Sequence, residues 1–538
     1  MKACRRFPAS STALLARLLI ITVTLFTGSA PGMAWASASA ASDASMPPPQ
    51  PHEIRVAEGE DTPTSMPGNI ARNTATDNIL ANVVESLVAL RADLSIGPML
   101  ADRWDMSADG RTYTFHLRHG VLFHDGTPMT SKEVKWSFTF LMKRSSGFEC
   151  RNVYEGSGPR VVDVRTPDPY TVVFELDRPN ALFLKHMVDP RCPLAVLSPS
   201  SVDRDGHWVR PVATGPYVFS EWKRGQYVLL KPFAHYRPRA EPPSGLAGAK
   251  IAHDDARFVV IPDEAAQKSA LVAGQIDMMS VAENALLPDD PRWRVVAGPS
   301  TDPSALLMQT RDPLLSDVRM RRAIALALDL PGIVNAVTDG RARYNPSLVP
   351  DASTLFTAVD ATGYTKNLAT VKQLLAAAGY KGQTLRLETS RRFAHMYALA
   401  VYVQSLLTQA GIPTELDIVE WGKQLADFRS GNFQLMSFGY SARIDPELMY
   451  ADVLGDKSVK PMAQWENPAA RTLLRSLQGV TDDATRKAVF EQLHRMMIAD
   501  VPMLVMYYTP DLLLVSTRLE GVSSWPVRRT RVFNVIKH

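Results

Sequence analysis

Three histidines that lie close together in the sequence are the first candidates for chemistry. His116, His119 and His124 fall within one short stretch, and neutral imidazole is a common ligand of zinc and other transition metals. No cysteine or carboxylate accompanies them at a spacing typical of a metal site. His116 falls on the outward phase of an expected strand, and His124 begins the turn His124-Asp125-Gly126. The pattern therefore predicts surface histidines rather than a metal site.

The familiar local signatures of catalysis and of nucleotide binding do not occur in the chain. The sequence contains no G-x-x-x-x-G-K-[ST], G-x-G-x-x-G, C-x-x-C, H-E-x-x-H or G-x-S-x-G. A catalytic triad is defined in space, so a secreted hydrolase stays open as an alternative. The pairs Met278-Met279 and Met496-Met497 lie among apolar residues, which is typical of a core rather than of a soft-metal site. We predict a protein that is not an enzyme and holds no cofactor.

The net charge of the chain is confined to a segment with the composition of a secretory signal peptide. The 538 residues carry a formal net charge of +4. Residues 1–36 contain four basic side chains and no acidic one, an apolar run at 18–26 and an A-x-A site at 34–36. The run is shorter than the ~20 apolar residues of a transmembrane helix, so we predict a cleaved signal peptide rather than an uncleaved anchor.

The remainder of the chain has the properties of an exported, soluble protein. Without residues 1–36 the chain is formally neutral, which argues against a nucleic-acid partner. Residues 37–51, rich in Ala, Ser and Pro, predict a flexible N-terminus. The apolar runs 504–508 and 512–515 are separated by Thr509-Pro510-Asp511 and predict two buried strands rather than a membrane span. We expect a periplasmic location.

Cys150 and Cys192 are the only cysteines outside the expected signal peptide. Export places them in an oxidising compartment, where disulfides form and persist. We therefore predict a disulfide between them; the alternative is two separate buried thiols.

The first half of the chain is rich in short strands and turns. Apolar residues alternate over 113–117 and over 172–176, each after a turn signal, and predict two strands. Thr130 and Glu133 have the spacing of a capping box and begin a predicted helix. The apolar face of this helix is Val134, Phe138 and Leu141.

Between about 300 and 500 the signals alternate between helix and strand. Apolar residues at helical spacing over 320–328 predict a buried helix face. A second helix face at 371–378 is followed by Gly379, and a third helix near 395–410 is followed by Gly411; glycine readily ends a helix in the left-handed conformation. An alternating run follows at 416–419, so this region predicts an α/β lobe.

Several segments, in a fixed order along the chain, together resemble family 5 extracellular solute-binding proteins, which are periplasmic receptors for peptide, nickel and opine ABC transporters. The resemblance covers nearly all of the chain after the signal peptide. The matching segments are Leu100–Trp104, Asp109–Arg118, Gly120–Thr130, Ala213–Tyr217, Leu271–Asp277, Asp317–Ala323, Leu374–Tyr380, Gly431–Met436 and Val501–Tyr508.

The resemblance implies an α/β periplasmic-binding-protein fold of two lobes with mixed sheets and a hinge between them. We place lobe I at 52–300, with an extra subdomain at about 85–205, and lobe II at 301–504. Residues 505–538 are expected to return to lobe I. The chain would then cross between the lobes near 306–308 and 503–505, and ligand would be enclosed between the lobes.

The same resemblance points to the segment 438–446 as the best site candidate. In classical peptide receptors this segment carries an aspartate that pairs with the amino terminus of the ligand, whereas the matching position here is Arg443. An arginine presents a planar fork of donors suited to a carboxylate or phosphate. We predict that Arg443 binds an anionic group; the alternative is an internal ion pair with Asp445 or another residue.

Further ligand-binding candidates are Tyr440, Asp445 and Trp421, with Met66 from a segment that approaches the ligand from lobe I. Trp421 follows the expected strand at 416–420, and strand ends commonly line a cleft in α/β lobes; a core position is the alternative for this residue. The predicted function is that of the substrate-binding protein of an ABC importer, which captures a peptide or peptide-like solute and delivers it to a membrane permease. The predicted partners are this ligand and the permease subunits, with a monomeric receptor. A receptor for a metal complex, haem or opine-like conjugate, or a signalling role, stays open.

Overall fold

The computed structural model describes residues 50–156, 159–281 and 290–538. The predicted signal peptide and nearly all of the predicted flexible N-terminus lie outside the described residues and stay predictions. Within the described ranges, we find no helix with the length and apolar content needed to cross a bilayer.

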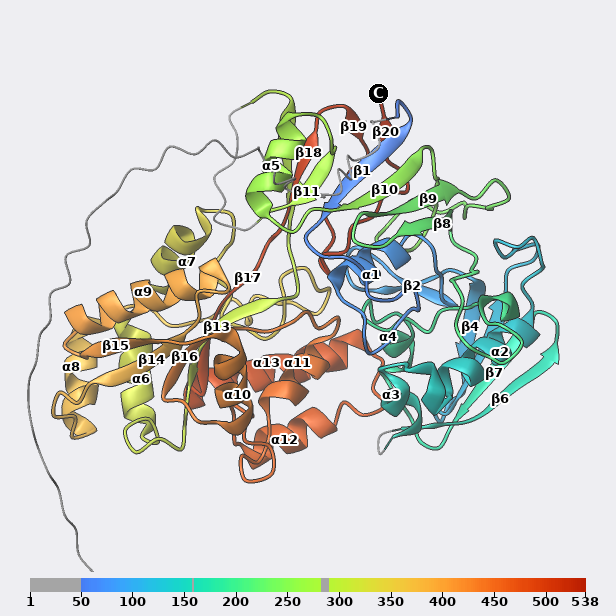
Figure 1. The fold of residues 1–538 in the computed structure, drawn as a ribbon. Helices are drawn as coiled ribbons and strands as arrows, with labels where there is room; N and C mark the ends of the chain where they lie inside the picture. Colours follow the sequence, from blue (N-terminus) through green and yellow to red (C-terminus); the bar gives the residue numbers. More distant parts are fainter. Residues whose placement is uncertain (1–49, 157–158, 282–289) are drawn as a thin grey trace, which may run out of the picture. The chain divides into compact units, whose positions relative to one another are not determined.

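Lobe I contains a seven-stranded mixed sheet, at the top of the view in Figure 1. Its middle strand pairs in parallel with the strands on both sides, whereas the outer pairs are antiparallel. The order across the sheet is β12 (Trp293–Gly298), β18 (Asp511–Ser516), β11 (Met278–Ser280), β1 (Glu53–Glu58), β10 (Asp255–Val260), β9 (Tyr227–Pro232) and β8 (Tyr217–Lys223).

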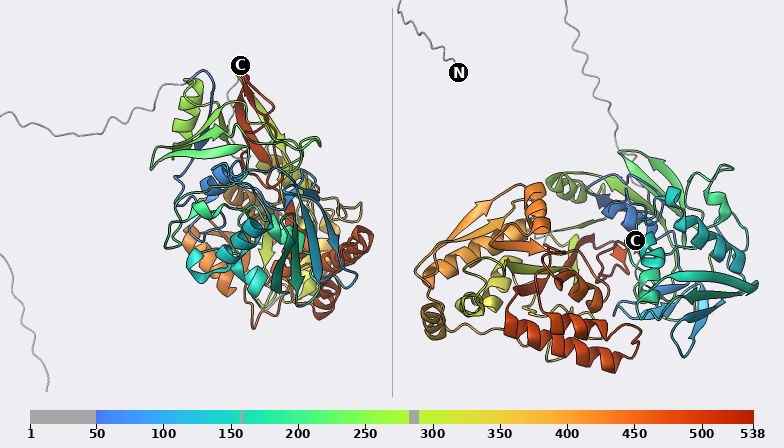
Figure 2. Two further views of the ribbon diagram at one scale, coloured as in Figure 1. Left: turned by 90° about the vertical axis from the view of Figure 1, so that its right-hand side faces the viewer. Right: turned by 90° about the horizontal axis from the view of Figure 1, so that it is seen from below.

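Lobe I also contains a separate four-stranded antiparallel sheet, whose strands are blue and teal in Figure 2. Its order is β4 (Ala101–Met106), β5 (Thr112–Leu117), β7 (Thr171–Leu176) and β6 (Val161–Asp168). Both strands expected from the alternating pattern, β5 and β7, are present. The remaining lobe I elements are α1 (Thr74–Leu80), α2 (Ser131–Met142), α3 (Arg151–Glu155), α4 (Phe183–Met187), α5 (Glu264–Val272), the strand pairs β2 (Val88–Leu90) with β3 (Ile96–Pro98) and β19 (Leu519–Glu520) with β20 (Ile536–Lys537), and two 3-10 turns at Arg144–Ser146 and Pro199–Ser201.

The predicted capping box at the start of α2 is confirmed. The Thr130 side chain accepts a hydrogen bond from the first turn, and the Glu133 carboxylate accepts one from the Thr130 backbone N–H at 2.9 Å. Val134 and Leu141 are buried on the inner face of this helix. The reciprocal bonds satisfy amides that would otherwise lack partners, which fixes where the helix begins.

Lobe II is built on a five-stranded sheet in the order β15 (Thr414–Ile418), β14 (Leu385–Thr389), β16 (Leu435–Gly439), β13 (Pro303–Met308) and β17 (Met503–Tyr508). Strands β15, β14 and β16 are parallel to one another, and β13 runs antiparallel to both of its neighbours. The helices of this lobe are α6 (Val318–Ala327), α7 (Leu330–Thr338), α8 (Leu368–Ala377), α9 (Ala394–Gln409), α10 (Trp421–Ser430), α11 (Pro446–Val453), α12 (Pro468–Arg475) and α13 (Asp483–Asp500).

Both faces of the lobe II sheet are covered. Consecutive residues of one strand belong to different apolar clusters: Leu435 packs in the cluster with Leu385 and Leu387, while Met436 packs in the cluster with Phe428. A strand buried on both faces is apolar at successive positions rather than at alternate ones. This explains the apolar run 305–308 of β13 and the unbroken apolar sequence of β17.

Glycine ends two of the predicted lobe II helices. Gly379 follows α8 with φ +69°, and Gly411 follows α9 with φ +84°. Side chains other than glycine are disfavoured at these angles. Each glycine turns the chain toward the next strand, β14 or β15, as the helix–glycine–strand pattern predicted.

Two short connections join the lobes. Residues 299–302 lead from β12 to β13, and residues 509–510 lead from β17 back to β18. The Thr509 backbone N–H donates to the Asp302 carbonyl at 2.9 Å, so the connections lie side by side. The expected crossing points at 306–308 and 503–505 instead fall inside β13 and β17. The break at Thr509-Pro510-Asp511 is the true second crossing, but the sequence does not show that the buried strands on its two sides, β17 and β18, belong to different sheets.

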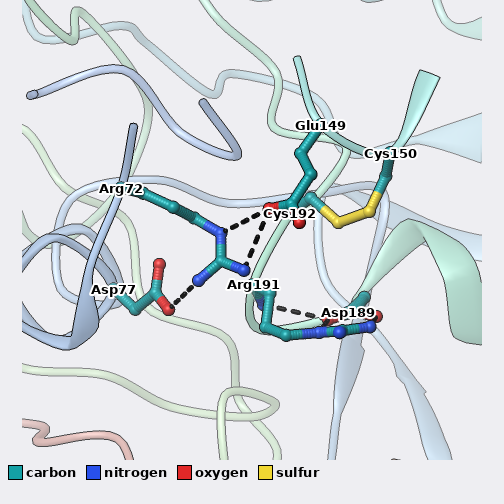
Figure 3. The surroundings of a disulfide bond; sticks show 7 residues. All are labelled: Arg72, Asp77, Glu149, Cys150, Asp189, Arg191 and Cys192. Carbon is teal, nitrogen blue, oxygen red and sulfur yellow. Dashed lines mark hydrogen bonds and ion pairs between the residues drawn. A yellow bond between two sulfur atoms is a disulfide. The ribbon is translucent and has the colours of Figure 1, made fainter. Parts of the chain in front are cut away.

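Cys150 and Cys192 form a disulfide in lobe I, with their Cα atoms 6.0 Å apart (Figure 3). The bridge joins the start of α3 to the segment after α4 and closes a loop across a sequence separation of 42 residues.

We expect replacement of both cysteines by serine to lower the free energy of unfolding by about 2–4 kcal/mol, because the unfolded chain regains the entropy of the open loop. Denaturant titration measures this loss. Thiol titration of the unfolded, unreduced protein lacking residues 1–36 should find no free thiol; two reactive thiols would contradict the bridge.

Candidate functional site

A cavity of about 990 Å³ lies between the two lobes, beside the connections that join them. We call it the interlobe cleft. Segments of both lobes and of both connections line it. Its lobe I wall includes Arg72, Asn73, Thr74, Asp77, Asp189, Pro190, Arg191, Val527, Arg528 and Arg529, and its lobe II wall includes Arg392, Phe393, His395, Trp421, Tyr440, Ser441, Arg443, Ile444 and Leu448.

The lobe II wall is made by residues that follow the carboxyl ends of parallel strands. Phe393 follows β14, Trp421 follows β15 and Tyr440 follows β16. The carboxyl ends of parallel strands lie at one edge of a sheet, which is where α/β folds place their ligands. The prediction of Trp421 rests on this rule and that of Tyr440 on the family segment 438–446, and the structure brings both to the cleft.

The rings at this edge form an aromatic wall. Trp421 meets Phe393 edge-on, with centroids 5.0 Å apart, and stacks on Phe438 at 6.0 Å. Phe438 in turn contacts Tyr440 at 5.2 Å. Such a wall offers a rigid apolar surface to a ligand at little cost in conformational entropy.

Tyr440 combines this apolar contact with a polar group. Burial raises the pKa of its hydroxyl well above the ordinary value, and the hydroxyl has no hydrogen-bond partner among the described residues. A buried hydroxyl without a partner is unfavourable. A ligand acceptor in the cleft would relieve this cost.

Arg443 lines the cleft, but its guanidinium is already engaged. Its Nε and Nη2 contact Asp452 at 2.7 and 2.6 Å, and its Nη1 donates to the carbonyls of Ser441 and Ala442. Asp452, rather than Asp445, is therefore the internal partner that the sequence left open. The charge available from Arg443 to an anionic ligand is reduced by this pair.

Asp445 and Met66 do not line the cleft. Asp445 is buried, caps the amino end of α11 by accepting from Glu447 N at 3.0 Å, and pairs with Arg486 at 2.5 Å. An aspartate before a first-turn proline is a favoured helix start, so this residue has a structural role. Met66 is buried in an apolar cluster of lobe I, and its sulfur accepts from Asn69 Nδ2 at 3.5 Å.

The arginines of the lobe I wall are each paired with a carboxylate. Asp77 lies between Arg72, at 2.8 Å, and Arg529, at 3.0 Å. Burial raises the pKa of Asp77 to about 6, although both arginines oppose the shift. Arg191 makes two bonds to Asp189, the shorter at 2.8 Å. Arg528 pairs with Asp302 at 3.3 Å, which joins the C-terminal segment after β18 to the connection at 299–302.

Arg392 is the exception within the described part of the cleft wall. It is exposed and lies over the ring of Phe393, with its guanidinium carbon 5.4 Å from the centroid. No carboxylate of the described residues lies within ion-pair distance of it. Sequence reasoning missed Arg392, although its position just after β14 is the same signal that pointed to Trp421.

The three histidines do not form a site. His116 pairs with Asp105 at 2.9 Å, and His119 is exposed and lies against Tyr170. His124 corrects the expectation of a surface side chain: its Nε2 donates to the Gly215 carbonyl and its Nδ1 accepts from Ala213 N. Burial lowers the pKa of His124 to about 4.

A buried carboxyl lies beneath the helix that carries Trp421. Both oxygens of Glu388, on β14, lack a hydrogen-bond donor among the described residues. Burial, with the nearby negative charge of Asp427, raises the pKa of Glu388 to about 7, and Lys423 offsets the shift only in part. The folded protein therefore holds a proton that the unfolded chain releases nearer the ordinary value of 4.5.

This difference predicts a pH-dependent stability. Because the folded-state pKa is the higher one, stability falls as the pH rises from about 4.5 to 7, by at most about 3 kcal/mol, and this group changes it no further above that range. Glu388→Gln should reduce this dependence in denaturant titrations at pH 5 and pH 8. Glu415→Gln, at an exposed position of the neighbouring strand, is the control and should leave it unchanged. Equal slopes for both variants would contradict the assignment.

The structure has two lobes built on open sheets, two adjacent connections and a large cavity between the lobes. These features define a class of ligand-binding proteins that enclose a solute at a hinge. Over residues 95–460, the chain matches the bacterial extracellular solute-binding proteins, family 5 Middle. The chain belongs to this family, which consists of binding proteins rather than enzymes.

Known relatives extend the likeness over almost the whole chain. The oligopeptide-binding protein AppA of Bacillus subtilis is 23% identical over 96% of this chain and 97% of its own length. NikA from Brucella suis, solved in complex with Fe(III)-EDTA, superimposes with a TM-score of 0.78 at 21% identity, covering 90% of this chain and all of that one. DppA from Helicobacter pylori, in complex with the peptide STSA, gives 0.70 at 24% identity, covering 90% and 98%.

Proposed function

We propose that this protein is the substrate-binding component of an ABC importer and captures a peptide or peptide-like solute in the interlobe cleft. The observation that carries the proposal is the cleft itself: about 990 Å³, lined by both lobes at their two connections. This volume is at the upper end of the ~300–1,000 Å³ range of small-molecule pockets. It suits a ligand larger than a single amino acid.

Binding and transport follow from closure of the lobes. A ligand that contacts both walls binds the closed arrangement better than an open one and so shifts the population toward closure. Ile444, from lobe II, is buried within the large apolar cluster of lobe I, so the lobes contact each other in this structure. The closed receptor then presents a surface to the membrane permease and releases the solute there.

The chemistry of the walls supports an elongated ligand with an apolar part and an anionic end. The aromatic wall of Phe393, Trp421 and Tyr440 covers the apolar part, and Arg392 is the available cation beside it. AppA and DppA have been solved with peptides, a nonapeptide and STSA. The carboxylate at the C-terminus of a peptide supplies the negatively charged partner that Arg392 lacks among the described residues.

A non-peptide solute is the second candidate. Solved structures with the same fold hold Fe(III)-EDTA or agropinic acid, and these ligands also carry carboxylates. The arginine-rich cleft suits a peptide or a non-peptide solute. A receptor with a signalling role would bind the same ligand.

The proposal includes a periplasmic location after cleavage of the signal peptide near residue 36 and a monomeric receptor that works with permease subunits. The basic start, the short apolar run and the A-x-A site support export.

Mass spectrometry of small molecules released by denaturing the purified protein identifies the ligand class. We expect peptides or peptide-like compounds that carry a free carboxylate. Recovery of a metal complex without peptide would instead favour the second candidate.

Replacing Arg392 with alanine should weaken binding of the released ligand about 10- to 100-fold, since a hydrogen bond to a charged group contributes about 1.5–3 kcal/mol. Isothermal titration calorimetry measures the change. The matched control is Arg391→Ala: this neighbouring exposed arginine lies near Tyr397 instead of lining the cleft. Equal losses in both variants would reject a specific role for Arg392.

Arg443→Ala tests the remaining sequence-based assignment in the same titration. Because Asp452 already neutralises Arg443, we expect a smaller loss than for Arg392→Ala. Unchanged affinity would reject a direct role of Arg443 in binding.

A further inference from the structure

The disulfide lies near Arg72, Asp189 and Arg191 (Figure 3), which line the lobe I wall of the interlobe cleft. We infer that the Cys150–Cys192 bridge is a positioning element for this wall and sets the affinity of the cleft for its ligand, in addition to stabilising the fold. The inference rests on the proposed function of the cleft, and three observations carry it.

The first observation is that the chain neighbour of each cysteine holds a charged group of the wall. Arg191 precedes Cys192, lines the cleft and forms a two-bond pair with Asp189. On the other side of the bridge, Glu149 precedes Cys150 and accepts from Arg72 at 3.0 Å. Arg72 lines the cleft and also contacts Asp77 at 2.8 Å. The bridge therefore links Glu149, which holds Arg72, to the segment that carries Arg191.

The second observation is that a third segment lies against both halves of the bridge. The Gly68 carbonyl accepts from Glu149 N at 2.8 Å, and Ile70 N donates to the Gly147 carbonyl at 2.9 Å. Gly68 has φ +65°, and a Cβ there would lie 2.9 Å from the Cys192 Cα and 2.5 Å from the Phe148 ring. Only glycine allows this approach. The segment continues through Arg72 into α1, which carries Asp77.

The third observation is that no sheet holds these segments. Residues 66–73 and 188–193 lie outside helices and strands, and Cys150 directly precedes the five-residue helix α3. Apart from side-chain packing, they are held by the isolated bridge between Asn69 and Phe148, by the ion pairs described above and by single hydrogen bonds such as Cys192 N to the Asp189 carbonyl at 3.0 Å. With the bridge open, a ligand would have to order the wall as it binds, which costs affinity.

The test compares the wild-type protein with the double variant Cys150→Ser, Cys192→Ser. Hydrogen–deuterium exchange without ligand is the first measurement. We expect the amides of Ile70, Glu149 and Cys192 to exchange at least ten-fold faster in the double variant, with no change in the five-stranded sheet. Unchanged exchange at these amides would overturn the inference.

Calorimetric titration with the tetrapeptide Ser-Thr-Ser-Ala is the second measurement. We expect about a ten-fold weaker affinity in the double variant. Leu407→Ala, in the buried core of lobe II, is the control for a general loss of stability and should bind like the wild type. An equal loss in this control, or wild-type affinity in the double variant, would overturn the inference.

The two proposals fail in different ways. If wild-type protein does not bind Ser-Thr-Ser-Ala and releases no peptide on denaturation, peptide capture fails, and exchange alone decides the positioning role. If the wild type binds the peptide and removal of the bridge changes neither exchange nor affinity, peptide capture stands and the positioning role fails.

Discussion

The architecture depends on one constraint: the chain passes between the two large sheets only twice within the described ranges, at adjacent points. The hydrogen bond from Thr509 N to the Asp302 carbonyl joins the connections, and the pair between Arg528 and Asp302 adds the returning C-terminal segment. Two adjacent covalent crossings leave each lobe free to move as a body about a single axis. They also place the ends of strands from both lobes around the same cavity.

The charges in that cavity follow from the cost of removing ions from water. An arginine at the edge of a partly buried cleft is unfavourable unless a carboxylate accompanies it. Arg72, Arg191, Arg443, Arg528 and Arg529 each have such a partner. The cleft is therefore rich in charges but close to neutral, and its electrostatic preference for a ligand depends on the few groups without a protein partner. Arg392 and the Tyr440 hydroxyl are such groups among the described residues.

Local and periodic features were predictable from the sequence because neighbouring residues determine them. The capping box of Thr130 and Glu133 needs only its own turn of helix, and the glycine stops at Gly379 and Gly411 need only their own backbone angles. The edge where Trp421 and Tyr440 lie follows from strand order. The ion-pair partner of Arg443 could not be predicted from the sequence, because the packing of α11 brings Asp452 to it. The burial of His124 likewise depends on a distant segment, 213–215, which no local pattern reveals.

The difference between local features and long-range contacts also explains how one fold can bind different solutes. Family resemblance identifies the position after β16 as a cleft position, and Arg443 does lie there. Whether that position recognises a charge depends on its neighbours, and here Asp452 neutralises it. The cleft cation without a carboxylate partner among the described residues is instead Arg392, which follows β14 and lies beside the same aromatic wall. Because each parallel strand delivers one loop to the cleft, ligand preference can move from loop to loop while the sheets and the hinge remain unchanged.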